Sequence, residues 1–260
     1  MSSPSTVYLI TGSNRGIGLG LVGYIAASRP NAFVYAGVRD PTKAVALEAL
    51  SNVYPGRIAI VKCVSADAEG NALLAKKIQK RHGRVDTVIA NAAVARVETT
   101  VLETPAKELE DHFTVNVLGT VVLFQALHSL LKASPAPRFI PVSTAAAPLA
   151  GPMTALPVRV AAYGASKAAL NFITRKIHFE KEWLVAFPLA PGAVDTDAGW
   201  VIAQAAMAND TIGAFGAVLE NFTVQTPDEA AKALVDLIDA ATRKKEGGEF
   251  VDVDGSRIPW

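Results

Sequence analysis

Short apolar runs alternate with longer helical patterns along the chain. Parallel strands need long crossover connections, which are usually helices, so this alternation predicts a mostly parallel sheet with helices on both faces. Seven runs fit strands: Val7–Ile10, Phe33–Val38, Ile58–Val64, Val85–Ala90, Phe139–Val142, Leu184–Leu189 and Glu249–Val253. No internal repeat or linker interrupts the series. We therefore predict a single doubly wound α/β domain over residues 1–260, with a mostly parallel seven-stranded sheet.

The composition supports a folded chain and excludes several classes of function. Half of the 260 residues are hydrophobic and 19% are charged, which is enough for one buried core. The net charge of +1 offers no electrostatic footprint for nucleic acid or an anionic membrane. Cys63 is the single cysteine and the four histidines are scattered, so we expect neither a disulfide nor a metal site.

Two further observations concern membranes and targeting. Residues Met1–Thr6 carry no positive charge, and the apolar run after them is too short for a signal peptide. The longest uncharged stretch, Phe139–Val158, contains four prolines, which a membrane helix would not tolerate. We expect a soluble, cytoplasmic protein without nucleic-acid or membrane partners.

One segment breaks the alternation. Residues 196–222 are apolar and rich in alanine and glycine, and they follow the sixth predicted strand. Doubly wound sheets hold ligands beyond the carboxyl ends of their strands, so this segment is a candidate substrate lid. A buried pair of ordinary helices would explain the same composition equally well.

A T-G-x-x-x-G-x-G turn, Thr11–Gly18, follows the first predicted strand and precedes a helix. Glycines there let the backbone approach a pyrophosphate, and the helix N-terminus points its N–H groups at that anion. A tight turn alone would also need glycines, but the position between strand and helix favours dinucleotide binding in a Rossmann-type domain. The candidate cofactor residues in the turn are Gly12, Asn14, Arg15, Gly16, Ile17 and Gly18.

The end of the second predicted strand bears on the choice of dinucleotide. A carboxylate there would bind a free ribose 2′-hydroxyl, but Arg39 follows Val38 instead. Together with Arg15, it could bind a 2′-phosphate through charge-assisted hydrogen bonds. This favours NADP(H) over NAD(H). The alternative is that both arginines are solvated surface charges, with Asp40 partly neutralising Arg39.

Tyr163 and Lys167 are spaced i, i+4 at the start of a predicted helix that runs to about Ile177. That spacing places the phenol and the ammonium on one helical face. A tyrosine with its ordinary pKa is a weak acid–base catalyst at neutral pH. We expect the nearby ammonium to lower the pKa of the phenol toward the working range.

Taken together, the glycine turn, the Tyr163–Lys167 pair and Pro191-Gly192 followed by Thr196 resemble the short-chain dehydrogenase/reductase family. The resemblance covers essentially the whole chain. Within the family, the run Ile177–Glu180 and the tail Asp254–Trp260 are similar to norsolorinic acid ketoreductase-like enzymes and to the sniffer/C-factor carbonyl reductases.

The resemblance implies a role for each matching position. Tyr163 would donate a proton to a carbonyl, Lys167 would tune it and hold the nicotinamide ribose, and Asn116 would anchor a water in the proton relay. The implied catalytic set is Tyr163, Lys167, Thr144, Asn116 and Ser143. Besides the glycine turn, Arg39, Tyr163 and Lys167, the implied cofactor contacts are Asp67, Asn91, Ala92, Pro191, Gly192, Val194 and Thr196.

The sequence also departs from the family pattern. The catalytic serine is usually the second of a Ser-Ser pair, but here the pair is Ser143-Thr144, which places Thr144 in the serine's position. A one-residue shift in register would keep Ser143 as the donor. The acidic residue expected directly after the third strand is absent near Val64, and Asp67 follows three residues later.

These observations favour an NADPH-dependent carbonyl reductase acting on an apolar or aromatic ketone or aldehyde. The apolar lining expected for the substrate is Ala145–Leu149, Met153, Leu156, Ala193 and the segment from Trp200 to Phe222. The alternative is a nucleotide-binding sensor or regulator with the reductase fold and little turnover. A homodimer or homotetramer is implied by the family, with pairing through Val115–Leu131 and Ala168–Ile177, although the prolines before Tyr163 could obstruct it.

Overall fold

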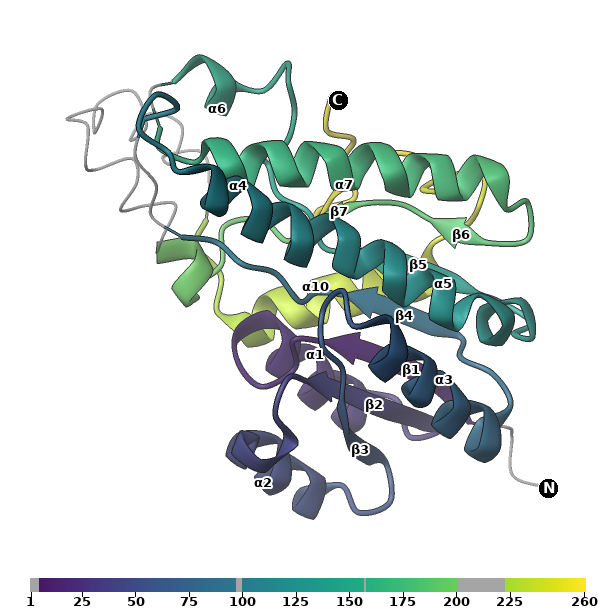
Figure 1. The fold of residues 1–260 in the computed structure, drawn as a ribbon. Helices are drawn as coiled ribbons and strands as arrows, with labels where there is room; N and C mark the ends of the chain where they lie inside the picture. Colours follow the sequence, from purple (N-terminus) through teal and green to yellow (C-terminus); the bar gives the residue numbers. More distant parts are fainter. Residues whose placement is uncertain (1–4, 97–99, 157, 201–222) are drawn as a thin grey trace.

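The computed structural model describes residues 5–96, 100–156, 158–200 and 223–260. Its centre is a six-stranded, fully parallel sheet in the order β3-β2-β1-β4-β5-β6, with helices on both faces (Figure 1). This is the doubly wound order, in which the direction of winding reverses between β1 and β4. The strands of this sheet are β1 (Thr6–Thr11), β2 (Ala32–Val38), β3 (Ile58–Lys62), β4 (Thr87–Ala90), β5 (Arg138–Pro141) and β6 (Val185–Ala186).

The helices connect successive strands across the two faces. They are α1 (Gly16–Ser28), η1 (Pro41–Lys43), α2 (Val45–Val53), α3 (Ala68–His82), α4 (Ala106–His112), η2 (Phe113–Leu118), α5 (Gly119–Lys132), α6 (Pro152–Ala155), α7 (Ala161–Glu180) and α10 (Pro227–Ala240). The helix expected to start at Tyr163 begins two residues earlier, at Ala161.

The two faces of the sheet carry separate apolar cores because successive side chains of a strand point to opposite sides. In β1, Tyr8 and Ile10 join the core beneath α1 and α10, while Val7 and Leu9 join the core beneath α3 and α5. All seven residues of β2 are buried, as the continuous apolar run predicts for a strand covered on both faces.

The sixth and seventh predicted strands, Leu184–Leu189 and Glu249–Val253, are arranged differently from the sequence prediction. The run Leu184–Leu189 forms two short strands, β6 and β7 (Leu189–Ala190), and β7 pairs with β8 (Val251–Asp252) in a separate two-stranded parallel sheet. Pro188 lies at the break, where a residue without an N–H cannot donate to a continuous ladder. The main sheet therefore has six strands rather than seven, and a bridge from Val142 to Leu189 places the small sheet beside β5.

One helical run among the described residues, Ala106–Lys132, is long and apolar enough to cross a membrane by length and composition alone. Half of its most apolar window is buried inside the domain, where α5 packs against α3 and the neighbouring turn η2 packs against α7. The apolar character of this run is therefore accounted for by the core.

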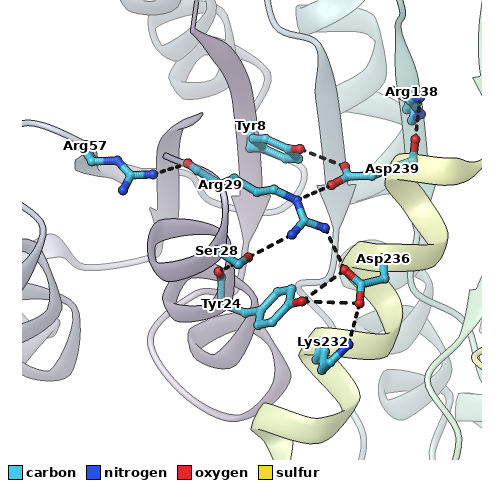
Figure 2. Close-up of polar contacts among 9 residues, drawn as sticks. All are labelled: Tyr8, Tyr24, Ser28, Arg29, Arg57, Arg138, Lys232, Asp236 and Asp239. Carbon is cyan, nitrogen blue, oxygen red and sulfur yellow. Dashed lines mark hydrogen bonds and ion pairs between the residues drawn. The ribbon is translucent and has the colours of Figure 1, made fainter. Parts of the chain in front are cut away.

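A charged cluster fastens α1 to α10 at the amino edge of the sheet (Figure 2). Arg29 donates to Asp236 at 2.7 Å and to Asp239 at 2.9 Å, and Tyr8 of β1 donates to Asp239 at 2.8 Å. Lys232 pairs with Asp236 at 2.7 Å, so hydrogen bonds from Lys232 and Arg29 hold the pKa of Asp236 at about 2. The cluster lies at the opposite edge from the strands' carboxyl ends.

Replacing Arg29 by Met should lower the free energy of unfolding by about 1–2 kcal/mol, because two carboxylates lose their shared partner in a partly exposed site. Urea denaturation measures the change. Lys176→Met is the control, since its pair with Glu180 joins two exposed side chains at 3.7 Å. We expect that control to lose less than about 0.5 kcal/mol. Equal losses in the two variants would contradict a fastening role for Arg29.

Candidate active site at the carboxyl edge of the sheet

The turn between β1 and α1 is built from glycines in close backbone contact. Gly12 and Gly16 have φ angles of +66° and +52°, which side chains rarely adopt. A Cβ atom on Gly18 would overlap the carbonyl oxygen of Gly12, so the helix rests directly on the turn. Ser13 fixes the turn from inside, donating its hydroxyl to the Ile10 carbonyl at 2.7 Å.

The residues directly after β4 form hydrogen bonds with the same turn. The Asn91 side-chain amide donates to the Thr11 carbonyl at 3.0 Å, and the Ala92 backbone N–H donates to the Thr11 hydroxyl at 2.9 Å. A Cβ atom on Gly12 would lie 2.9 Å from the Ala92 Cα. Asn91 and Ala92, expected beside the cofactor, therefore also fix the shape of the turn.

The start of α1 fits an anionic group. Arg15 occupies the N-cap position, but its side chain makes no capping hydrogen bond, and the first turn has no acidic residue. The helix therefore presents N–H groups and the positive end of its dipole without competition from a capping side chain. Asn14 is exposed, and Gly16 and Ile17 are half-buried around this point. These residues fit the pyrophosphate of a dinucleotide.

The two arginines expected to bind a 2′-phosphate lie in different environments. Arg15 forms an ion pair with Asp197, and both side chains are largely exposed. Arg39 is exposed at the end of β2 and has no ion-pair partner in the described part of the chain. Asp40 accepts from the Thr42 hydroxyl at 2.6 Å and lies 3.7 Å from Lys43, so it is not the partner of Arg39.

Asp67 has a clear local role in the structure. Its carboxylate accepts from the Gly70 backbone N–H at 2.9 Å and caps the N-terminus of α3. The adenine contact implied for Asp67 by the family stays a prediction.

The loop after β7 approaches the glycine turn from the other side. Gly192 has a φ angle of +73°, and Val194 pairs with Gln225 across an isolated bridge. The Thr196 hydroxyl accepts from the Gly199 N–H at 3.1 Å, and a Cβ on Gly16 would lie 3.3 Å from the Thr196 methyl group. Pro191, half-buried, begins this loop. Residues 201–222 of the candidate lid lie outside the described residues.

Tyr163 and Lys167 lie on the buried face of α7, with 7% and 3% of their surface exposed. Burial raises the pKa of Tyr163 to about 12, and a hydrogen bond with Thr144 opposes part of that increase. Burial lowers the pKa of Lys167 to about 8. The predicted lowering of the phenol pKa by Lys167 is therefore wrong, because desolvation of the phenolate dominates.

The position of Lys167 accounts for its small effect on the phenol. Its ammonium donates to the Val142 carbonyl at 2.7 Å and lies 5.8 Å from the centre of the Tyr163 ring. At neutral pH the site therefore combines a protonated phenol with a buried ammonium.

The two neighbouring hydroxyls, Ser143 and Thr144, point to different places. Thr144 forms a hydrogen bond with Tyr163 and also accepts from the Ala146 N–H at 3.2 Å. Ser143 is buried and donates to Asn171 Oδ1 at 2.6 Å. Adjacent residues on extended backbone face opposite sides, and only Thr144 faces the phenol.

Asn116 connects α7 to the segment after β4. It lies in η2, a π-helical turn inside the long helical run. Its Nδ2 donates to the Ser166 hydroxyl at 2.9 Å and to the Val94 carbonyl at 3.1 Å, and its Oδ1 accepts from the Val94 N–H at 2.9 Å. These bonds connect α7 to the segment after β4. They do not test the water-anchoring role implied for Asn116, which stays a prediction.

Sequence reasoning missed Ser166 and Asn171. Both are fully buried on α7 and support Asn116 and Ser143 from behind. Helical spacing could have predicted both, because residues three or four positions apart share a helix face. Asn171 is four residues beyond Lys167, and Ser166 is three residues beyond Tyr163.

A cavity of about 480 Å³ lies beside the start of α7, between that helix and residues 146–156 and 158–160. Five residues of the predicted apolar lining line it, namely Ala146, Ala147, Leu149, Met153 and Leu156, whereas Ala145, Pro148, Ala193 and Trp200 do not. Thr144 and Tyr163 are not among them either. The cavity reaches the hydroxyl pair through one layer of residues, which includes Ala146 and Val160.

Comparison with known proteins identifies the family. A sequence profile of the short chain dehydrogenase family matches residues 6–206. Norsolorinic acid ketoreductase of Emericella nidulans is 34% identical, with 100% of this chain and 95% of the relative covered. NADPH-bound carbonyl reductase from chicken fatty liver has a TM-score of 0.81 at 25% identity, covering 99% of this chain and 100% of that chain.

Carbonyl reductase Sniffer of D. melanogaster shares the fold, with a TM-score of 0.81 at 22% identity over 99% of this chain and 100% of that chain. The resemblance inferred from the motifs is confirmed. The chain belongs to the short-chain dehydrogenase/reductase family, a family of oxidoreductases, and its relatives include ketoreductases and carbonyl reductases.

Removing the Ser143 hydroxyl should destabilise the fold, because Asn171 Oδ1 would lose the donor that lies 2.6 Å away. We expect Ser143→Ala to lower the free energy of unfolding by about 1–3 kcal/mol. Chemical denaturation measures it, with Ser129→Ala on the exposed surface of α5 as the matched control. If Ser143→Ala were as stable as Ser129→Ala, the Ser143–Asn171 bond would not be a structural support.

Proposed function

We propose that this short-chain dehydrogenase/reductase uses NADPH to reduce an apolar or aromatic ketone or aldehyde to the alcohol, with Tyr163 as the proton donor. The observation that carries the proposal is the hydrogen-bonded pair of Thr144 and Tyr163 above the buried Lys167. This group lies at the carboxyl edge of the parallel sheet, the edge that also carries the glycine turn.

The side chains divide the work as follows. Thr144 donates a hydrogen bond to the carbonyl oxygen, which stabilises the negative charge that develops there. Tyr163 transfers its phenolic proton to that oxygen, and its raised pKa keeps the proton in place until the alkoxide forms. Lys167 supplies positive charge beside the phenol. A bound nicotinamide cofactor would supply the hydride to the carbonyl carbon.

The substrate class and the cofactor are supported by two kinds of observation. The cavity beside α7 has mostly apolar walls, and the names of the relatives specify a ketoreductase and an NADPH-bound carbonyl reductase. Arg39 has no ion-pair partner among the described residues, and it lies at the end of β2, where a 2′-phosphate would lie in this fold. A nucleotide sensor would not need the Thr144–Tyr163 pair, so we favour the reductase.

Association with a second copy is part of the proposal. Phe113 and Leu118 of η2 and Phe172 of α7 are 39%, 50% and 67% exposed. The helices that carry them pack against each other, and a two-fold dimer would cover these side chains. Sedimentation of the purified protein tests this, with Phe172→Glu expected to shift the dimer toward monomer.

Tyr163→Phe should abolish the oxidation of NADPH by a panel of aromatic ketones while leaving NADPH binding nearly unchanged, because the phenol acts only as the alkoxide forms. Loss of NADPH absorbance measures turnover, and calorimetry measures binding. Tyr54→Phe, on the far side of the molecule after α2, is the matched control and should keep full activity. A phenylalanine variant that kept more than about a tenth of the wild-type kcat, a change of less than about 1.4 kcal/mol in activation free energy, would exclude Tyr163 as the acid.

Arg39→Ala should raise the KM for NADPH at least about tenfold and leave the KM for NADH nearly unchanged, because a charge-assisted phosphate contact is worth roughly 1.5–3 kcal/mol. Arg15→Ala should have a smaller effect, since Arg15 already pairs with Asp197. Steady-state kinetics with both cofactors test the difference. Equal use of NADPH and NADH by the wild-type protein would contradict the assignment of NADP(H).

The value of kcat/KM for reduction should fall as the pH rises through about 8. Burial lowers the pKa of Lys167 to that value, so the ammonium loses its proton there, whereas the Tyr163 phenol keeps its own. Lys167→Arg should remove this decrease, because a guanidinium stays charged. A decrease at the same pH in Lys167→Arg would assign it to another group.

A further inference from the structure

The cavity of about 480 Å³ beside α7 has the size and lining of a ligand site. Its walls come from the start of α7, from the residues after β5, and from α6, which lies above α7 in Figure 1. Its large apolar lining residues are Val101, Leu149, Met153, Leu156, Val158 and Val160. The Thr154 hydroxyl is already committed to the carbonyl of Gly151 at 2.7 Å.

Arg159 is the one charged side chain among the described residues that line this cavity. Its Nε atom is buried and has no hydrogen-bond partner, and no carboxylate of the described chain pairs with its guanidinium. Arg138 also has an unpaired Nε, but its Nη2 donates to the Asp239 carbonyl at 2.9 Å. Arg39 also has no ion-pair partner in the part of the chain that the structure describes, but its side chain is exposed to solvent.

A buried N–H group without a partner, such as the Nε of Arg159, is costly, because it has lost water without gaining a hydrogen bond. The flat fork of donors of the guanidinium matches the two oxygens of a carboxylate. Small hydrated anions such as phosphate or sulfate fit the cavity less well than an apolar carboxylate does. Their remaining oxygens would be buried against the apolar walls without hydrogen-bond partners.

We propose that this cavity binds an apolar carboxylate, with the carboxylate on Arg159 and the hydrocarbon or aromatic body against Leu149, Met153 and Leu156. The site is distinct from the glycine turn and from the Thr144–Tyr163 pair. It touches that pair through Val160, which packs on Tyr163, and through Ala146, whose N–H bonds to Thr144. The ligand is therefore either the far end of a keto acid substrate or a separate molecule bound beside the reacting group.

Calorimetry with octanoate and octanamide tests the pairing directly and does not depend on turnover. We expect octanoate to bind the wild-type protein at least tenfold more tightly than octanamide. Arg159→Gln should weaken octanoate at least tenfold and leave octanamide nearly unchanged, and Arg159→Lys should restore part of the affinity. Arg81→Gln, on α3 and not among the residues that line the cavity, is the matched control and should bind octanoate as the wild-type protein does.

A second variant tests the walls. Ala168→Phe adds a ring to the α7 side of the cavity while leaving Arg159 in place, so it should weaken octanoate and octanamide alike. The proposal is overturned if octanoate does not bind the wild-type protein, or if Arg159→Gln binds octanoate as well as Arg81→Gln does.

Inhibition kinetics then identify the source of the carboxylate. Competition between octanoate and a ketone would place the substrate's far end in the cavity, and noncompetitive inhibition or activation would indicate a separate ligand; both agree with the proposal. If no ketone were reduced, the proposed reductase function would fail, while the calorimetric result on Arg159 would stand by itself.

Discussion

The direct backbone contact between α1 and the turn that precedes it determines how the rest of the site is placed. Gly18 lies against the carbonyl of Gly12, so close that a side chain at this position would overlap the turn. Asn91 holds this turn from β4, and Thr196 touches it at Gly16. One close approach therefore brings β1, β4 and the loop after β7 to a single point at the carboxyl edge.

Burial sets the electrostatic character of the reacting group. Tyr163 and Lys167 are both withdrawn from water, and their pKa values move in opposite directions, each toward the neutral form. The phenol is therefore a weak acid that keeps its proton until a strong base, such as an alkoxide, forms beside it. The Val142 carbonyl and the Thr144 hydroxyl supply the polar contacts that make this burial tolerable.

The sequence was sufficient for the features that depend on local pattern. Apolar runs identified the strands, and the spacing of the glycines identified the turn after β1. Helical spacing placed Tyr163 and Lys167 on one face. Properties that depend on the folded environment of a side chain could not be predicted from the sequence. The pKa of Tyr163 required knowledge of its burial, and the different partners of Ser143 and Thr144 required the position of Asn171 on another element. The partner of Arg15 lies 182 residues away, beyond the reach of any motif. Pro188, by contrast, was visible in the sequence, and its missing N–H could have predicted the break between β6 and β7.

The ion pair between Arg15 and Asp197 has a consequence for affinity measurements. Asp197 is an internal competitor for any anion that would bind Arg15, so the observed affinity of that anion includes the separation of the pair. Both side chains are exposed, and an exposed pair is weak, so the exchange costs little. Added salt screens the internal pair and the external contact together. The affinity of this guanidinium for a phosphate should therefore vary less with ionic strength than the affinity of a lone surface arginine would.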